Sequence, residues 1–262
     1  MTILRRYDTG PIVHLEMNAP QKLNALSDEM LAALQTQIDE IKHDNSIKVV
    51  ILSGSGKAFC AGHDIKQMNG ARSSEDGGKE YFQDLFSRCT NVMMGIQSLP
   101  QVVIAQVHGI ATAAGCQLVA SCDLAMADED TQFGVNGVDI GLFCSTPMVA
   151  LSRNIPRKHA LEMLTTGKFI TASRAADLGL INHAVPADSL EDETNKLAET
   201  IASKLGAAVR IGKSAFYEQL QMPTDQAYKF TSEVIVENLL YRDTIEGMTA
   251  FAEKRHPNWQ KK

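Results

Sequence analysis

The stretch AAGCQLVASCD, residues 113–123, begins with three small residues and contains one amide side chain, Gln117, before the sequence becomes apolar again. It follows an apolar run, residues 102–107, that has the length of a buried strand. Small residues let backbones approach closely, and free N–H groups at a helix start attract negative charge. The stretch therefore predicts a strand that runs into a helix, with outward N–H groups near Ala114. Close packing of the helix on the strand explains the small residues equally well.

Composition limits the classes of function. The chain has 262 residues, of which 44% are hydrophobic, enough for a substantial core. A net charge of -6 argues against a nucleic-acid surface or a polybasic membrane patch. The five scattered cysteines indicate neither a disulfide framework nor a zinc site, and no run approaches the ~20 apolar residues of a membrane span. We expect a cytoplasmic protein with a small-molecule ligand, no nucleic-acid or membrane partner and no metal.

Hydrophobic periodicity predicts an α/β chain. Strands are expected at residues 12–17, 49–52, 102–107 and 124–127. Helices are expected at residues 27–41, 80–98, 190–204, 206–220 and 224–254, and a polar, glycine-rich loop at residues 68–78. We expect a core of residues 1–189 and a helical C-terminal oligomerisation region of residues 190–262, within one domain and without a linker.

A second segment, KAFCAGHDIK at residues 57–66, begins like a strand that ends at Ala61-Gly62. Polar residues follow directly after Gly62. Gly62 permits a sharp turn that would expose the N–H of His63. A simple strand-to-loop turn, with His63 as a surface residue, is the alternative. If the N–H groups of His63 and Ala114 converged on one carbonyl oxygen, they would form an oxyanion hole.

Taken with other segments, these two make the chain resemble the crotonase, or enoyl-CoA hydratase/isomerase, superfamily. The segments that carry the resemblance are NAPQKLNAL (18–26), FCAGHDIK (59–66), AAGCQLVASCD (113–123), QFG (132–134), PRKHALEM (156–163) and LTTGKFITASRAADLGL (164–180). The chain is particularly similar to the subgroup called enoyl-CoA hydratase domain-containing protein three. The resemblance implies a ClpP/crotonase-like spiral of ββα turns with a C-terminal helical trimerisation region, assembled as a homotrimer or a dimer of trimers.

The resemblance also implies a ligand and a site. The ligand would be an acyl-CoA or enoyl-CoA thioester, with coenzyme A as part of the substrate and no separate cofactor. Its thioester oxygen would lie between the N–H groups of His63 and Ala114, which would stabilise enolate-like charge. Positions that match the family's CoA contacts are Lys22, Leu23, Ala25, Ala61, Ile65 and Lys66, together with Phe251 and Lys254, which in many members reach a neighbouring subunit's site.

The chain departs from the hydratase pattern at two positions. Typical members place two glutamates on the water that is added, and these positions map to Gln117 and Gly137. A positioned acid or base contributes roughly 10²- to 10⁴-fold to a rate, so we expect hydratase activity to be weak or absent. Replacing both residues by glutamate should then raise the hydratase activity. Of two nearby groups, Asp139 is interpreted as a helix or turn cap and Cys144 as an inert buried thiol.

The sequence thus predicts an acyl-CoA-binding enzyme of the hydratase/isomerase type, in fatty acid metabolism, that has an oxyanion hole but lacks both glutamates. Isomerisation, thioester hydrolysis, decarboxylation and weak hydration all remain open as its reaction. The alternatives are a noncatalytic acyl-CoA binder or regulator and a hydratase with relocated acids.

Overall fold

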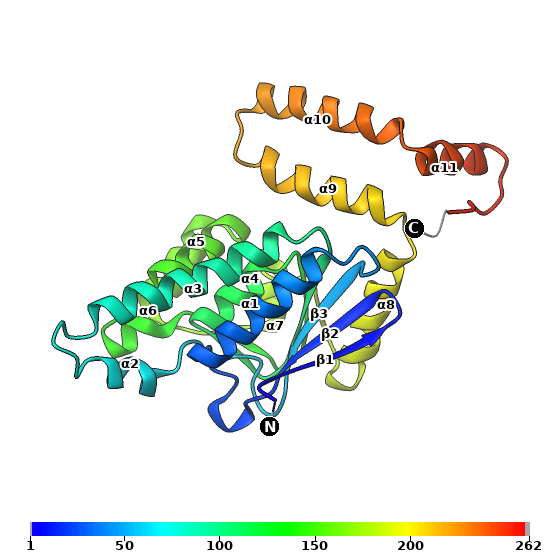
Figure 1. The fold of residues 1–262 in the computed structure, drawn as a ribbon. Helices are drawn as coiled ribbons and strands as arrows, with labels where there is room; N and C mark the ends of the chain where they lie inside the picture. The colour runs from blue at the N-terminus through cyan, green and yellow to red at the C-terminus, as the bar shows by residue number, and fades with distance from the viewer. Residues whose placement is uncertain (1, 260–262) are drawn as a thin grey trace.

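A six-stranded sheet forms the centre of the computed structural model, which describes residues 2–259 (Figure 1). Its strands, in spatial order, are β1 (Leu4–Thr9), β2 (Ile12–Met17), β3 (Val49–Gly54), β4 (Val102–Val107), β6 (Leu124–Asp128) and β9 (His183–Val185). Strands β1 and β2 form an antiparallel hairpin, and each later neighbour is added in parallel. Parallel neighbours need crossover connections, which the helices between these strands supply.

A smaller sheet contains β5 (Ile110–Thr112), β7 (Gln132–Gly134) and β8 (Ile170–Thr171). Strand β5 follows β4 in the chain, and β7 follows β6, so each of these two turns adds a strand to both sheets before the next helix. The first complete turn ends in α4 (Ala114–Ser121). The spiral of ββα turns that the resemblance implies is confirmed.

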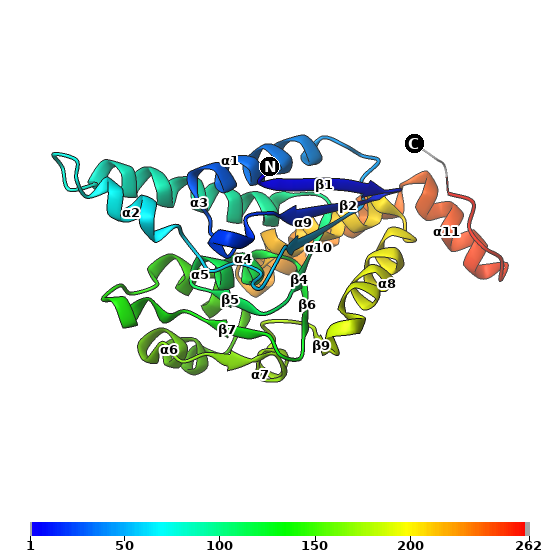
Figure 2. The ribbon, with the colours of Figure 1, turned by 90° about the horizontal axis from the view of Figure 1, so that it is seen from below.

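Helices cover both faces of the large sheet because alternate strand residues point in opposite directions. Val50 and Leu52 pack with the buried faces of α1 (Asp28–Lys42), α3 (Lys79–Ser98) and α4, whereas Val49 and Ile51 pack against α8 (Leu190–Ala202). The remaining core elements are α2 (Ile65–Ala71), α5 (Ser145–Asn154), α6 (Arg157–Thr166), α7 (Ala172–Leu178) and the 3₁₀ helices η1 (Pro20–Lys22), η2 (Asn136–Ile140) and η3 (Ala187–Ser189). Figure 2 shows α8 on the opposite side of the large sheet from α1 and α3.

The last three helices extend beyond the core (Figure 1). They are α9 (Gly206–Gln219), α10 (Thr224–Leu239) and α11 (Arg242–Ala252). No residue of α10 is buried, and its outward side chains include Tyr228, Val236 and Leu239. Residues 260–262 of the predicted C-terminal region lie outside the described residues. Within residues 2–259, no helix is both long and apolar enough to cross a membrane.

Two predicted boundaries are wrong. The loop expected at residues 68–78 begins inside α2, whose first turn is capped by Asp64 through the N–H groups of Lys66 and Gln67. Asp64, directly before Ile65, is an N-cap signal for this helix. The glycines at positions 70, 77 and 78 favoured a loop instead. The single helix expected at residues 224–254 is two helices, because the backbone of Tyr241 is extended and begins a new one.

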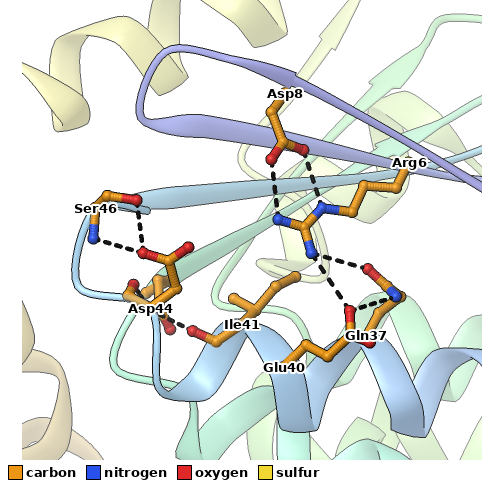
Figure 3. A network of polar contacts seen from close by, with 8 residues as sticks. Arg6, Asp8, Gln37, Glu40, Ile41, Asp44 and Ser46 are labelled. Atoms are coloured by element: carbon orange, nitrogen blue, oxygen red, sulfur yellow. Dashed lines mark hydrogen bonds and ion pairs between the residues drawn. The ribbon is translucent and has the colours of Figure 1, made fainter.

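A polar network joins the edge strand β1 to α1 on the surface (Figure 3). The Arg6 guanidinium donates to both Asp8 oxygens, at 3.0 and 2.9 Å, and to Gln37 of α1 at 3.2 Å. Its Nη1 also lies 3.6 Å from Glu40. Because the group is partly exposed, we expect it to fix the position of the edge strand more than to stabilise the fold.

A buried ion pair attaches α9 to the core. Lys213 Nζ lies 2.6 Å from Asp123 Oδ2 and also donates to the carbonyl oxygens of Ile96 and Gln101. Tyr217 of the same helix donates to Asp123 Oδ1 at 2.8 Å. Burial lowers the pKa of Lys213 and raises that of Asp123. All three N–H groups of the Lys213 ammonium are therefore hydrogen-bonded. They join α9 to the core beside Asp123, the last residue of AAGCQLVASCD.

Replacing Lys213 by methionine should lower the free energy of unfolding by about 3 to 5 kcal/mol, because Asp123 would remain buried without its cation. Urea unfolding at fixed protein concentration measures the loss. Lys196→Met, which breaks the exposed pair with Glu193 in α8, is the control and should change stability little. Equal losses in the two variants would contradict the anchoring role of Lys213.

Candidate active site

The two turns singled out in the sequence lie side by side. Cys60 forms a parallel bridge with Ala111, in which Cys60 N donates to Ile110 O at 3.2 Å and Thr112 N donates to Cys60 O at 3.0 Å. Beyond this bridge both segments turn. A Cβ placed on Gly62 would lie only 3.3 Å from Ala114 N. His63, the residue after Gly62, therefore follows directly beside the start of α4.

The backbone N–H groups of His63 and Ala114 both lack a hydrogen-bond partner within residues 2–259. Their neighbours are paired: Ala113 N donates to Gly134 O at 2.9 Å, and Ala61 N donates to Leu23 O at 3.0 Å. Unpaired N–H groups in the interior are rare, and two from different segments make a strong site for an oxygen atom. The two turns are therefore adjacent, and the convergence of their N–H groups on one oxygen atom stays a prediction.

Small residues are required at this junction for separate reasons. Gly62 has φ +89°, and a Cβ on Gly115 would collide with the carbonyl oxygen of Cys60. Ala113 has φ 50° and ψ -119°, a conformation that costs a residue with a Cβ about 1 to 3 kcal/mol. This backbone strain could not be predicted from the residue types. The close packing that was one of the two alternatives for AAGCQLVASCD is therefore present, and it leaves the Ala114 N–H without a partner within the described residues.

Six predicted CoA contacts lie along two touching segments. Leu26 N donates to Gly62 O at 2.8 Å, and Lys22 Nζ lies 3.2 Å from Asp64 Oδ2. Leu23 and Ile65 expose 44% and 47% of their surface, large fractions for apolar side chains. The structure brings together Lys22, Leu23, Ala25, Ala61, Ile65 and Lys66.

Asp64 holds the second of these segments in place. Its carboxylate accepts from Lys66 N and Gln67 N at the start of α2 as well as pairing with Lys22. Burial raises the pKa of this carboxyl, but the hydrogen bonds from Lys22, Gln67 and Lys66 outweigh burial, so the pKa is lowered. Asp64 is thus a charged structural group at neutral pH.

Asn24 is a supporting residue that the sequence interpretation missed. It is fully buried with φ 52°. Its Oδ1 accepts from Ala19 N at 2.9 Å, and its Nδ2 donates to Ser55 O and Ala58 O, both at 2.8 Å. The asparagine in KLNAL could have indicated a left-handed turn, since asparagine tolerates that conformation better than most residues.

Phe251 and Lys254 do not join the other predicted contacts within one chain. Phe251 lies on α11 and is 87% exposed, and Lys254 follows that helix with φ 57°. Figures 1 and 2 both show α11 at the opposite end of the molecule from α2. Phe251 and Lys254 could therefore contact CoA together with the other predicted residues only if they reached the site of a neighbouring copy of the chain.

Gln117 and His63 each hold a buried polar atom without a partner. Gln117 is only 5% exposed, and its Oε1 has no hydrogen bond within the described residues. The same holds for His63 Nε2, whereas Nδ1 of that ring lies 3.4 Å from Leu26 O. Burial lowers the pKa of His63, so its ring is neutral at pH 7. Two of the four such atoms in residues 2–259 thus belong to the site.

Gly137 stands where the backbone leaves no room for a side chain. A Cβ there would lie 2.7 Å from Leu142 O and 2.8 Å from Cys144 Sγ. The loop after η2 therefore fills the space beside Gly137. This geometry argues against the expected gain from simply placing glutamates at positions 117 and 137, because the second would first have to displace the backbone of Leu142.

Two further candidates are settled by their surroundings. Cys144 is buried, which raises the pKa of its thiol, and this agrees with an inert group. The interpretation of Asp139 as a cap is wrong: within the described residues its carboxylate makes no hydrogen bond at the start of η2. Its oxygens lie instead beside Gly167, at the end of α6.

Comparison with known proteins agrees with this geometry. The family described as Enoyl-CoA hydratase/isomerase matches residues 8–262. The chain belongs to the enoyl-CoA hydratase/isomerase family. It is 46% identical to human mitochondrial enoyl-CoA hydratase domain-containing protein 3 over 248 residues, which are 95% of this chain and 80% of that protein.

Solved structures of this family share the complete fold. A crystal structure of an enoyl-CoA hydratase from Mycobacterium smegmatis superposes with a TM-score of 0.94 at 49% identity, covering 98% of each chain. The human domain-containing protein 3 structure gives 0.93 at 45% identity, covering 98% of this chain and all of that one. The particular similarity to this subgroup of the family is thereby confirmed.

Gly137→Ala should lower the free energy of unfolding by about 1 to 3 kcal/mol, because the added methyl group would overlap the Leu142 carbonyl. Chemical denaturation measures the loss. Gly70→Ala in α2 is the control, since a Cβ there meets nothing within 4 Å, and it should be neutral or slightly stabilising. A Gly137→Ala protein as stable as the parent would show that the loop after η2 yields easily.

Proposed function

We propose that the protein binds acyl-CoA thioesters and acts on them through an oxyanion hole formed by the N–H groups of His63 and Ala114. The observation that carries the proposal is that these two donors are unpaired and adjacent. A thioester oxygen between them would receive two hydrogen bonds, which strengthen as enolate charge develops on it. Preorganised donors of this kind contribute on the order of 10²- to 10³-fold each to a rate.

The CoA portion would lie along Lys22, Leu23, Ala25, Ala61, Ile65 and Lys66. The ammonium groups of Lys22 and Lys66 suit phosphates, and the exposed side chains of Leu23 and Ile65 suit the pantetheine and adenine. Asp64 lies 3.2 Å from Lys22 Nζ and neutralises part of the charge on this ammonium group. Affinity would come mainly from this surface.

Hydration should be slow, because neither position that matches a hydratase glutamate carries a proton-transferring group. Gln117 cannot exchange a proton at neutral pH, and the space beside Gly137 is filled by Leu142 and Cys144. We therefore favour an enzyme of altered crotonase chemistry over an efficient hydratase. A noncatalytic acyl-CoA binder is the second candidate, favoured by the absence of an acid at Gln117 and Gly137.

Thioester recognition can be tested without a variant. Butyryl-CoA should bind at least about fivefold more tightly than S-butyl-CoA, a thioether of the same length without the carbonyl oxygen, since two hydrogen bonds contribute about 1 to 3 kcal/mol. Calorimetry measures both constants. Equal affinities would contradict the oxyanion hole, and undetectable binding of both compounds would contradict the CoA site itself.

Mass spectrometry of acyl-CoAs incubated with the same preparation then separates an enzyme from a binder. A new product from any member of the panel supports catalysis. Binding with every acyl-CoA recovered unchanged favours the second candidate, whereas crotonyl-CoA hydration at ordinary enzyme rates would contradict the weak-hydratase proposal.

We further propose assembly as a trimer or a dimer of trimers. The support is the apolar surface of the C-terminal helices, where Val236, Leu240 and Phe251 are 57%, 75% and 87% exposed. Large exposed apolar surfaces commonly mark contacts between proteins. A neighbouring copy would cover it and could bring Phe251 and Lys254 to a CoA site.

Leu240→Glu should shift the assembly toward monomers, because it would place a charge in the proposed apolar contact. Light scattering coupled to size exclusion at micromolar concentration measures the mass. Glu233→Lys, an exposed charge change in α10, the helix that Leu240 caps, should leave the mass unchanged. A monomeric parent protein would contradict the assembly.

A cytoplasmic location remains a prediction. The human relative is described as mitochondrial. The five free thiols suit a reducing compartment of either kind.

A further inference from the structure

The chain after α11 folds back along that helix. The Arg255 guanidinium donates to both carboxylate oxygens of Glu246, at 2.6 and 3.0 Å. The N–H of Asn258 donates to the same carboxylate at 2.7 Å. Exposed ion pairs usually contribute little, but two parallel hydrogen bonds from an arginine to one carboxylate fix its geometry. Residues 255–259, the tail, are therefore attached to α11 by more than a solvated charge pair.

Helix α11 has two opposite faces, and the tail covers one of them. With about 3.6 residues per turn, Glu246 and Ala250 lie on the same face. The Trp259 ring packs beside them, 2.9 Å from where a Cβ on Gly247 would be. The opposite face is apolar and exposed, and it consists of Ile245, Met248 and Phe251. The tail thus leaves the apolar face free for a neighbouring copy of the chain.

Helix α11 needs this support because it has little other packing. It lies beyond the core (Figure 1), and Ala250 is its one buried residue within residues 2–259. It has 11 residues, and isolated helices shorter than ~12–15 residues are marginal in water. The hydrogen bonds from Arg255 lower the pKa of Glu246 to about 2, so the pair stays charged at neutral pH.

Lys254 lies at the turn between α11 and the tail, in a conformation that usually requires glycine. Its φ is 57° and its N–H donates to Phe251 O at 3.2 Å, while Arg255 N donates to Ala250 O at 3.0 Å. These two bonds form a Schellman motif, in which glycine is the usual residue with positive φ. A lysine persists there only when its surroundings hold it, and such strain often accompanies a function.

We propose that Arg255 is a positioning residue, which fixes Lys254 by binding Glu246 so that the lysine ammonium meets a phosphate of CoA bound to a neighbouring copy. This inference rests on the proposed acyl-CoA function and assembly. Within the described residues the Lys254 ammonium has no ion pair, and an ammonium group suits a phosphate. Arg255 itself touches no ligand, because Glu246 and Glu253 occupy its guanidinium.

The inference is tested by calorimetry with butyryl-CoA. Arg255→Met should raise the Kd about three- to tenfold, because Lys254 would no longer be held where it meets the phosphate. Arg242→Met, which removes one positive charge from the same helix at an exposed position, is the control and should leave the Kd unchanged. Light scattering and circular dichroism should give the parent's mass and helix content for both variants.

Lys254→Gly separates positioning from general stability. Glycine suits a φ of 57°, so this variant should be at least as stable as the parent, yet its Kd should rise by a similar factor. Adding Arg255→Met to Lys254→Gly should change the Kd no further, because Arg255 acts on the ligand only through Lys254. A role of Arg255 in stability alone would give losses of affinity that add.

An unchanged Kd in Lys254→Gly, or in folded and assembled Arg255→Met, would overturn the inference, and so would additive losses in the double variant. If Arg255→Met unfolds or dissociates, Glu246→Gln takes its place. Failure of both variants to assemble would also overturn it, since the pair would then hold the assembly rather than Lys254. In all these cases the parent protein still binds butyryl-CoA, whereas undetectable binding by the parent contradicts the proposed function itself.

Discussion

The site depends on the contact between the Cys60 carbonyl and the start of α4. This oxygen accepts from Thr112 N at 3.0 Å and lies where a side chain at Gly115 would be. The two turns can come together only because Gly115 has no Cβ. If α4 stood further away, the N–H groups of His63 and Ala114 could not address one oxygen atom. A packing constraint and the proposed oxyanion hole therefore depend on the same residue.

The strain at Ala113 is supported by the fold around it. Its N–H donates to Gly134 O in β7, and its carbonyl accepts from Gln117 N within α4. Both partners belong to regular elements, and the cost of about 1 to 3 kcal/mol is small beside the burial of α4, every residue of which is buried. The backbone donors that result do not depend on side-chain identity, which explains why a histidine is acceptable at position 63.

The sequence could predict what periodicity and local chemistry encode. The four strands it indicated and the helices α1 and α3 were found, as was the helix start at Ala114. It could not predict the conformation of Ala113 or the orphan atoms of Gln117 and His63, because these depend on contacts between segments far apart in the chain. Asn24 was missed for the same reason: its three hydrogen bonds go to two different loops.

The proposed site offers two backbone donors for an oxygen atom, but Gln117 and Gly137 offer no group that transfers a proton. A glutamate as buried as Gln117 would have a raised pKa and could exchange protons near neutrality, whereas an amide cannot. Burial lowers the pKa of His63, which makes it a weaker base, and raises that of Cys144, which keeps the thiol protonated. The two backbone donors need no protonation state at all. Under the proposed function, such a site would hold and polarise a thioester better than it would add water across a double bond, and the protons for any reaction would come from the ligand or from water.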